Sequence, residues 1–306
     1  MKELSVVSGR WFIKLYRISA LISVYLFLIF PVFAQNKPCE FNSKTLQFTG
    51  KPVEQARCLL RPNKIGGVLG EQLEKLPFPL EKLVGKKVKI KKENLREYLQ
   101  KNNISEISIG GFLDETLSKA KMLGGEEIEA LYFVIHDTSS PYLKDEPFPA
   151  NFDSDADWKG NDLNIWLKQP VAHAFVNRLG ESITVNDFSK TVTKGWGTKF
   201  ARDFLKIDGK GLQIHIELVQ PRRRDVNNPN PANDLIAPVP GFTEEQYKKL
   251  ALLYIAASVR RGTWLIPAFH SVLDAGIKDA HDDPQNFELQ KFAQKINYLL
   301  RKIDDK

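Results

Sequence analysis

The sequence predicts an α/β domain with a central, mainly mixed β-sheet flanked by helices. Two observations support this prediction. Segments of strand length, either continuously apolar or alternating, recur between Ala130 and Gln220. Two longer segments further along the chain carry apolar residues with helical spacing, at 243–262 and 287–303. Strands mixed with helices in one region are typical of an α/β layer architecture.

The first 34 residues have the pattern of a secretory signal peptide. Four basic residues precede an apolar run over 18–34 that ends in Val32 and Ala34, which suit a cleavage site after Ala34. An uncleaved anchor helix is the alternative, but the run is short for a span of about 20 residues, and Pro31 lies near its end. We therefore expect an exported protein, periplasmic or secreted, with no stable membrane span once the signal is removed.

The only two cysteines, Cys39 and Cys58, follow the expected cleavage site. In an oxidising compartment an isolated pair forms one disulfide, which would pin the mature N-terminus. Neither cysteine has C-x-x-C spacing, so a cysteine zinc site is not expected.

The 306-residue chain has a formal net charge of +7. Residues 1–34 contribute +3 of this, which leaves +4 on the mature chain. A mildly basic surface favours an anionic polymer such as a cell wall. We find no nucleic-acid motif and expect no nucleic-acid partner. Nothing in the sequence requires more than a monomer.

Residues 35–127 are predicted to be an N-terminal extension that packs on a main domain at 128–306. They contain short apolar segments, Gly and Pro punctuation and a lysine-rich stretch. Within them, "KENLREYLQKN" (92–102) has the pattern of a short amphipathic helix.

Four strands are predicted in the main domain. "ALYFVIH" (130–136) is continuously apolar, as in a strand buried on both faces. The segment 172–180 alternates and ends in a turn glycine, and 182–188 is its expected hairpin partner. The segment 211–220 alternates as well, so His215 and Glu217 lie on the same face.

Helices follow the strands. Thr243 and Gln246 form a capping box at the start of the helix predicted over 243–262, and Gly262 ends it. A further apolar run, 264–270, again ends in a histidine, and a final helix is predicted from Phe287. The Pro-, Asn- and Asp-rich loops at 140–170 and 220–242 are long enough to form the walls of a site.

Two of the five histidines, His136 and His270, each end an apolar run and precede a polar turn. Strand ends can be neighbours at one edge of a sheet, which suits a solvent-open zinc site with histidine and carboxylate ligands. The segment 276–287 offers His281, Asp282 and Asp283 as a third ligand, and its residues alone do not choose among them. Each histidine taken singly is also compatible with a structural role.

Five motifs occur in an order that resembles a known family: "VIHDTSS", "AHAFVNRLGE", "IHIEL", the histidine at 270 and "HDDPQNF". The chain over roughly 128–290 resembles zinc-dependent N-acetylmuramoyl-L-alanine amidases of the amidase-2 type. These are relatives of peptidoglycan recognition proteins and of lysozyme-like phage amidases. The resemblance implies a zinc amidase domain over 128–306, with peptidoglycan as substrate and Zn²⁺ as cofactor.

Residue by residue, the resemblance implies that His136, His270 and Asp283 are the zinc ligands. Asp283 matches the aspartate that precedes a proline in the family, although a slip of one residue would exchange it with Asp282. The family's glutamate falls on Glu217, which would be the general base.

The family also has a cationic residue, usually lysine, two positions before the ligand aspartate. His281 occupies that position here. A histidinium can donate to an oxyanion, but its charge depends on pH in a way that the charge of lysine does not. Lys278, three residues earlier, is the alternative source of the cation.

Two more residues are assigned to substrate binding. Trp196 matches a tryptophan near the family's cleft, with packing as the alternative, and Arg222 is placed to meet stem-peptide carboxylates, with a solvated loop as the alternative. His173 and His215 are interpreted as neighbours of the site that are not ligands.

The resemblance thus implies an exported zinc hydrolase that cleaves the amide between N-acetylmuramic acid and L-alanine. The alternatives are a non-catalytic peptidoglycan-binding module of the same fold and, third, a zinc peptidase that acts on the stem peptide. The apparent presence of all three ligands and of the glutamate favours the enzyme.

Overall fold

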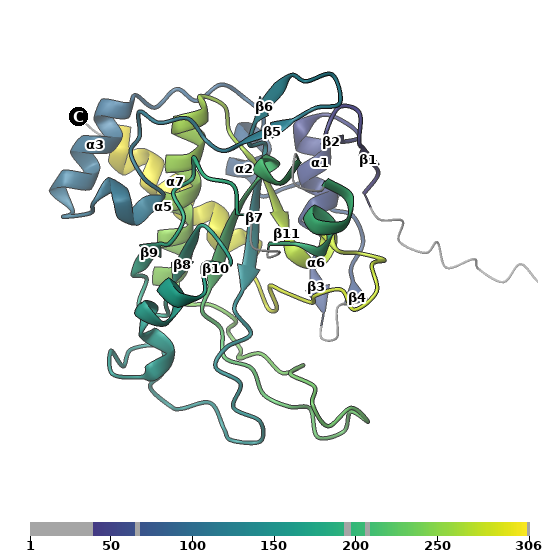
Figure 1. Ribbon diagram of the computed structural model, residues 1–306. Helices are drawn as coiled ribbons and strands as arrows, with labels where there is room; N and C mark the ends of the chain where they lie inside the picture. The colour runs from purple at the N-terminus through teal and green to yellow at the C-terminus, as the bar shows by residue number, and fades with distance from the viewer. Residues whose placement is uncertain (1–38, 65–67, 193–196, 206–208, 305–306) are drawn as a thin grey trace, which may run out of the picture. The chain divides into compact units, whose positions relative to one another are not determined.

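The segments predicted as strands form one mixed central sheet (Figure 1). A computed structural model describes residues 39–304 except 65–67, 193–196 and 206–208, so the predicted signal peptide lies outside the described residues. The strand order is β11-β7-β10-β8-β9. These strands are β7 (Tyr132–Asp137), β8 (Ala174–Val176), β9 (Ser182–Thr184), β10 (Gln213–Leu218) and β11 (Ile266–Phe269).

Four of the five strands run parallel, and only β9 is antiparallel, paired with β8 at the edge. Every residue of β7, β8 and β11 is buried, as the apolar run of β7 predicts for a strand covered on both faces. The predicted hairpin between β8 and β9 is confirmed.

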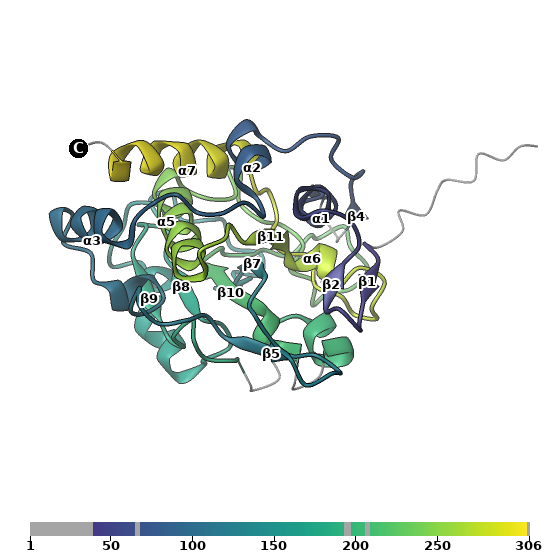
Figure 2. The same ribbon diagram turned by 90° about the horizontal axis from the view of Figure 1, so that it is seen from above.

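One face of the sheet is covered by α5 (Glu244–Arg261) and α7 (Leu289–Asp304), as Figure 2 shows. The predicted capping box of α5 is present, and Gly262 ends the helix in the left-handed conformation that glycine tolerates. Tyr254 joins the layers, because its ring contacts Phe133 of β7 on one side and Phe292 of α7 on the other. The last helix starts at Leu289, two residues after the expected start at Phe287.

The other face of the sheet is covered by segments far apart in the sequence. The hydroxyl of Tyr132 accepts a hydrogen bond from the backbone N–H of Phe48, at 2.9 Å. The ring of Phe48 in turn stacks on Phe200, which begins the irregular segment before β10. Cys39 and Cys58 form the predicted disulfide, which ties the start of the described chain to α1 (Pro52–Leu59).

Residues 39–127 share the hydrophobic core of the rest of the described chain. Leu59 of α1, Leu80 of α2 (Phe78–Leu83) and Leu95 of α3 (Lys92–Lys101) are fully buried in one cluster with the residues of the sheet. Helix α1 contacts β11, while α2 and α3 contact α7. The helix predicted over 92–102 is therefore confirmed as α3.

Short elements complete the described chain. The short strands are β1 (Phe41–Asn42), β2 (Gln47–Phe48), β3 (Asn63–Lys64), β4 (Val68–Leu69), β5 (Lys119–Lys121) and β6 (Glu127–Glu129). The 3₁₀ segments are η2 (Glu106–Ile109), η3 (Lys159–Asn161), η4 (Leu163–Lys168) and η6 (Lys210–Leu212), and η5 (Ala201–Leu205) is a π-helical turn. In the part of the chain that the structure describes, no helix combines the length and apolarity needed to cross a membrane.

Candidate metal centre

The register of three neighbouring parallel strands brings His270, His136 and Glu217 into one row. Glu217 of β10 is paired with His136 of β7, and Phe269 of β11 is paired with Ile135 of β7. His270 follows Phe269 and therefore lies beside His136. All three residues stand at the carboxyl ends of the strands, where open α/β sheets commonly bind ligands.

His270 differs from the prediction in one respect. It begins the short helix α6 (His270–Leu273) directly after β11, whereas the sequence suggested that it ends the strand. The change of direction turns the chain away from the sheet and into the loop that carries Asp283.

Asp283 completes a buried cluster with the two histidines. Nδ1 of His136 lies 2.9 Å from Nδ1 of His270 and 3.6 Å from Oδ2 of Asp283. Nδ1 of His270 lies 2.9 Å from Oδ1 of Asp283. Each of the three residues is at most 3% exposed. Among the described residues, this is the group of imidazole and carboxylate side chains that could hold a metal ion.

The spacing of these atoms fits a single small ion. Bonds of about 2.0–2.1 Å in tetrahedral geometry place ligand atoms about 3.3 Å apart. The observed separations of 2.9 to 3.6 Å bracket that value. Two imidazole nitrogens and one carboxylate form a donor set that zinc accepts, with a fourth position left for water or substrate.

Both histidines are hydrogen-bonded through Nε2, the ring nitrogen that points away from the cluster. Nε2 of His270 lies 2.9 Å from Oδ2 of Asp274, which is itself fixed by the backbone N–H groups of Lys199 and Phe200. Nε2 of His136 lies 2.9 Å from Nδ1 of His215. In both histidines the Nδ1 atom therefore faces the cluster while Nε2 is engaged elsewhere, as is usual for metal-binding histidines.

Backbone groups position Asp283. Its Oδ2 accepts a hydrogen bond from the N–H of Asp137 at 3.2 Å, and its carbonyl accepts one from the N–H of Ser271 at 2.9 Å. Because these donors adjoin the two histidines in sequence, the loop that carries Asp283 is hydrogen-bonded to the end of β7 and to α6. The carboxylate of Asp282 lies near Arg222, with Oδ1 3.6 Å from Nη1. Asp283 is therefore the carboxylate that belongs to the cluster.

The electrostatics of the cluster favour a cation. Burial alone would lower the pKa of His270, but the carboxylates of Asp283 and Asp274 raise it to about 10. Burial and the neighbouring His270 lower the pKa of His136 to about 3. Burial would raise the pKa of Asp283, but the charge of His270 holds it well below its ordinary value. Without a metal ion, a proton on His270 thus supplies the positive charge of the cluster.

Glu217 stands next to the three candidate ligands. Its Oε1 lies 3.8 Å from Nδ1 of His136, and its buried Oε2 has no hydrogen-bond partner among the described residues. Burial raises the pKa of Glu217 well above its usual range, and the charge of Asp283 adds to the effect. A carboxylate with a raised pKa and an open acceptor atom has the properties of a general base.

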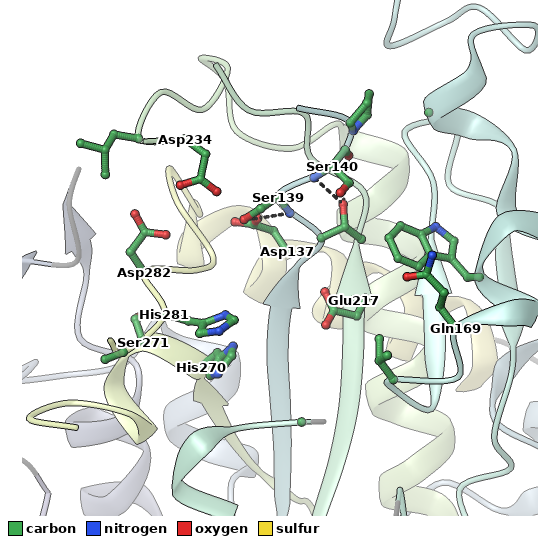
Figure 3. Close-up of a pocket in the computed structure, with 18 of the residues that line it drawn as sticks. Asp137, Ser139, Ser140, Gln169, Glu217, Asp234, His270, Ser271, His281 and Asp282 are labelled. Atoms are coloured by element: carbon green, nitrogen blue, oxygen red, sulfur yellow. Dashed lines mark hydrogen bonds between the residues drawn. The ribbon is translucent and has the colours of Figure 1, made fainter. Parts of the chain in front are cut away.

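Glu217 and His270 line a pocket of about 1160 Å³. Figure 3 shows His270 and His281 on one side of it and Glu217 on the other. Residues of the two long loops line it, as predicted, including Lys159 and Trp166 of the first loop and Asp234 of the second.

His281 lies at the open side of the cluster. Its ring centroid is 4.6 Å from that of His270, and its Nδ1 is 3.6 Å from Oδ1 of Asp283. Its side chain is 57% exposed. Lys278 is exposed too, but it is not among the described residues that line the pocket. Of the two candidate cations, His281 is therefore the one beside the cluster.

Arg222 does not occupy a position for substrate contact. Its side chain is fully buried, and Nη2 donates to Oδ2 of Asp137 at 2.6 Å. A second nitrogen, Nη1, lies 3.6 Å from Asp282. Arg222 is thus neither a solvated loop residue nor a group free to bind a stem-peptide carboxylate. It instead compensates the buried charge of Asp137, whose backbone N–H holds Asp283.

Of the three other residues predicted near the site, the structure describes His173 and His215. Trp196 lies outside the described residues. His173 and His215 are buried behind His136, as expected for residues that are not ligands. Asp274 was not predicted as part of the site. Its spacing of four residues after His270, which places both on one face of a short helix, is the signal that could have identified it.

No protein-family model matches the chain, and no curated protein or solved structure is significantly similar to it. The resemblance of its motifs to the zinc amidases therefore remains a prediction.

Proposed function

We propose that this protein is an exported zinc amidase that hydrolyses the bond between N-acetylmuramic acid and L-alanine in peptidoglycan. The observation that carries the proposal is the partly buried Glu217 carboxylate beside the cluster of His136, His270 and Asp283, with Glu217 and His270 lining one large pocket. The order of the sequence motifs supplies the substrate class.

The chemistry follows from the residues. An ion held by the cluster would polarise the scissile carbonyl and lower the pKa of water toward about 7. Glu217 accepts the proton of the attacking water and transfers it to the leaving nitrogen of L-alanine. A C–O bond forms as the C–N bond breaks, giving a lactyl carboxylate and a free peptide amine. His281, whose ring lies beside that of His270, would donate a hydrogen bond to the developing oxyanion.

The pocket suits an extended substrate. Its volume of about 1160 Å³ exceeds the 300–1,000 Å³ typical of small-molecule sites. Its lining combines apolar side chains such as Ile165 and Val171 with Lys159, which offers a charge to a stem-peptide carboxylate. A polymer that joins sugar and peptide presents both kinds of surface.

Export is supported by two features. The first 34 residues have the composition of a signal peptide, and Cys39 and Cys58 form a disulfide of the kind found in oxidising compartments. The proposed location is the periplasm or the cell exterior.

The test is to incubate the purified protein with peptidoglycan, with and without a chelator, and to identify the products by mass spectrometry. The proposal expects chelator-sensitive release of stem peptides that begin with L-alanine. Peptides cut within the stem would identify a peptidase, and binding without products would identify a recognition module.

Two adjacent carboxylates provide matched variants. Asp283→Asn removes a candidate ligand and should abolish both activity and Zn²⁺ binding. Asp282→Asn changes the neighbouring carboxylate, which is outside the cluster, and should leave Zn²⁺ bound. Equal Zn²⁺ binding by both variants would contradict the assignment of the centre.

A further inference from the structure

Three histidines form a continuous hydrogen-bonded row that ends at the metal cluster. Nε2 of His136 lies 2.9 Å from Nδ1 of His215. The backbone N–H of His215 donates to Nδ1 of His173 at 3.0 Å. Nε2 of His173 lies 2.9 Å from the carbonyl oxygen of Lys190. All three side chains are at most 3% exposed, so no solvent competes for these contacts.

The directions of the two hydrogen bonds of His173 follow from the backbone groups that it contacts. A backbone N–H is always a donor, so Nδ1 of His173 is the acceptor and its proton is on Nε2, which donates to the carbonyl of Lys190. This arrangement makes His173 a fixed, neutral support for the backbone of His215.

The direction of the bond between His136 and His215 is assigned from the cluster. Nδ1 of His136 faces His270 and Asp283, and it needs a free lone pair to bind an ion. The proton of His136 must then be on Nε2, which donates to Nδ1 of His215. His215 can accept it only with its own proton on Nε2.

Packing leaves His215 little freedom to turn. Its ring stacks on His173 with centroids 5.9 Å apart and an interplanar angle of 11°. Gly197 lies against its other edge. A Cβ at position 197 would be 2.8 Å from Cε1 and 2.9 Å from Nε2 of His215, and the φ of +89° at this glycine also disfavours a side chain.

We propose that His215 is a positioning residue for His136: its Nδ1 accepts the Nε2 proton of His136 and so directs the Nδ1 lone pair of His136 at the ion. The inference rests on the proposed metal centre and adds a residue that contacts neither ion nor substrate. His270 has the carboxylate of Asp274 in the equivalent place, whereas His215 orients its ligand without adding charge. Loss of such a partner typically weakens metal binding 10- to 100-fold.

The test compares two substitutions in the full protein. His215→Asn keeps an acceptor oxygen near the place of Nδ1, and His215→Leu removes it. Zn²⁺ affinity is measured by competition with a chromophoric chelator, and Co²⁺ absorption reports the ligand geometry. We expect His215→Leu to bind Zn²⁺ about 10- to 100-fold more weakly with an altered Co²⁺ spectrum, and His215→Asn to recover most of the affinity.

A third measurement does not depend on the variants or on bound metal. Nitrogen NMR of the ion-free wild-type protein shows which imidazole nitrogens carry protons, and we expect none on Nδ1 of His215. A protonated Nδ1, or equal Zn²⁺ affinity in the wild type and His215→Leu, or no recovery by His215→Asn when both variants are folded, would overturn the inference. A wild-type protein that binds no Zn²⁺ would instead overturn the proposed centre.

Discussion

Binding of Zn²⁺ to the ion-free protein should release about one proton from His270. In the absence of an ion, Asp283 and Asp274 raise the pKa of His270 to about 10, so this imidazole is charged at pH 7. Its Nδ1 faces the cluster and must lose its proton to become a ligand. The Nε2 proton, which is shared with Asp274, stays in place.

The magnitude follows from linkage. Below a pKa of about 10, the ion competes with one proton, so the apparent affinity should rise about tenfold for each pH unit. Between pH 6 and pH 9 the gain is about 1,000-fold, or about 4 kcal/mol. Affinity for the ion should rise with pH and not fall, because the pKa of His270 is raised. Lowering the pH protonates Nδ1 of His270 and so weakens the binding of the ion.

Isothermal titration calorimetry at pH 7 in buffers of different ionisation enthalpy counts the released protons. Glu217 is a second possible source, because its pKa is also raised. The variant Glu217→Gln removes that source and should still release about one proton. If Glu217→Gln releases none, or if affinity stays flat between pH 6 and pH 9, the charge assignment of the cluster is wrong.

Four further outcomes are expected. Arg222→Met should lower the free energy of unfolding by about 3–5 kcal/mol, because it leaves a buried carboxylate unpaired; Arg224→Met, which breaks a partly exposed pair, should cost no more than about 1 kcal/mol in the same urea titration. Glu217→Gln should slow hydrolysis about 10²- to 10⁴-fold without loss of bound Zn²⁺, and a variant that keeps full activity would exclude Glu217 as the base. The same change should stabilise the ion-free protein more at pH 8 than at pH 5, because a carboxyl whose pKa is raised on folding loses stability as the pH rises. Replacing Cys39 and Cys58 by serine should cost about 3 kcal/mol, given their separation of 19 residues; an unchanged urea midpoint would show that the bond does not restrict the unfolded chain.

The sequence identified the parts of the fold that local patterns encode. The run that became β7 is apolar throughout, and the cap residues at Thr243 and Gly262 define both ends of α5. His136 and His270 could be predicted as neighbours because each directly follows apolar strand residues, and parallel strands bring such ends together.

Other features depend on contacts that leave no local pattern. Asp282 and Asp283 are adjacent and chemically identical, and only the backbone donors of Asp137 and Ser271 decide which one joins the cluster. Arg222 belongs to a basic run that looks exposed, yet its burial follows from the position of Asp137 on another strand. The short strands of residues 39–127 are two or three residues long, too short to show any periodicity.

The in-register pairing of β11, β7 and β10 has a consequence for how this protein can change. Side chains alternate across a sheet, so sliding β10 by a single position past β7 would exchange Glu217 for Ile216 or Leu218 and aim the carboxylate at the opposite layer. Loop insertions spare this alignment, whereas one residue gained or lost inside β10 destroys it. Diversity among descendants of this chain should therefore accumulate around the rim of the cavity and stay out of the strands beneath.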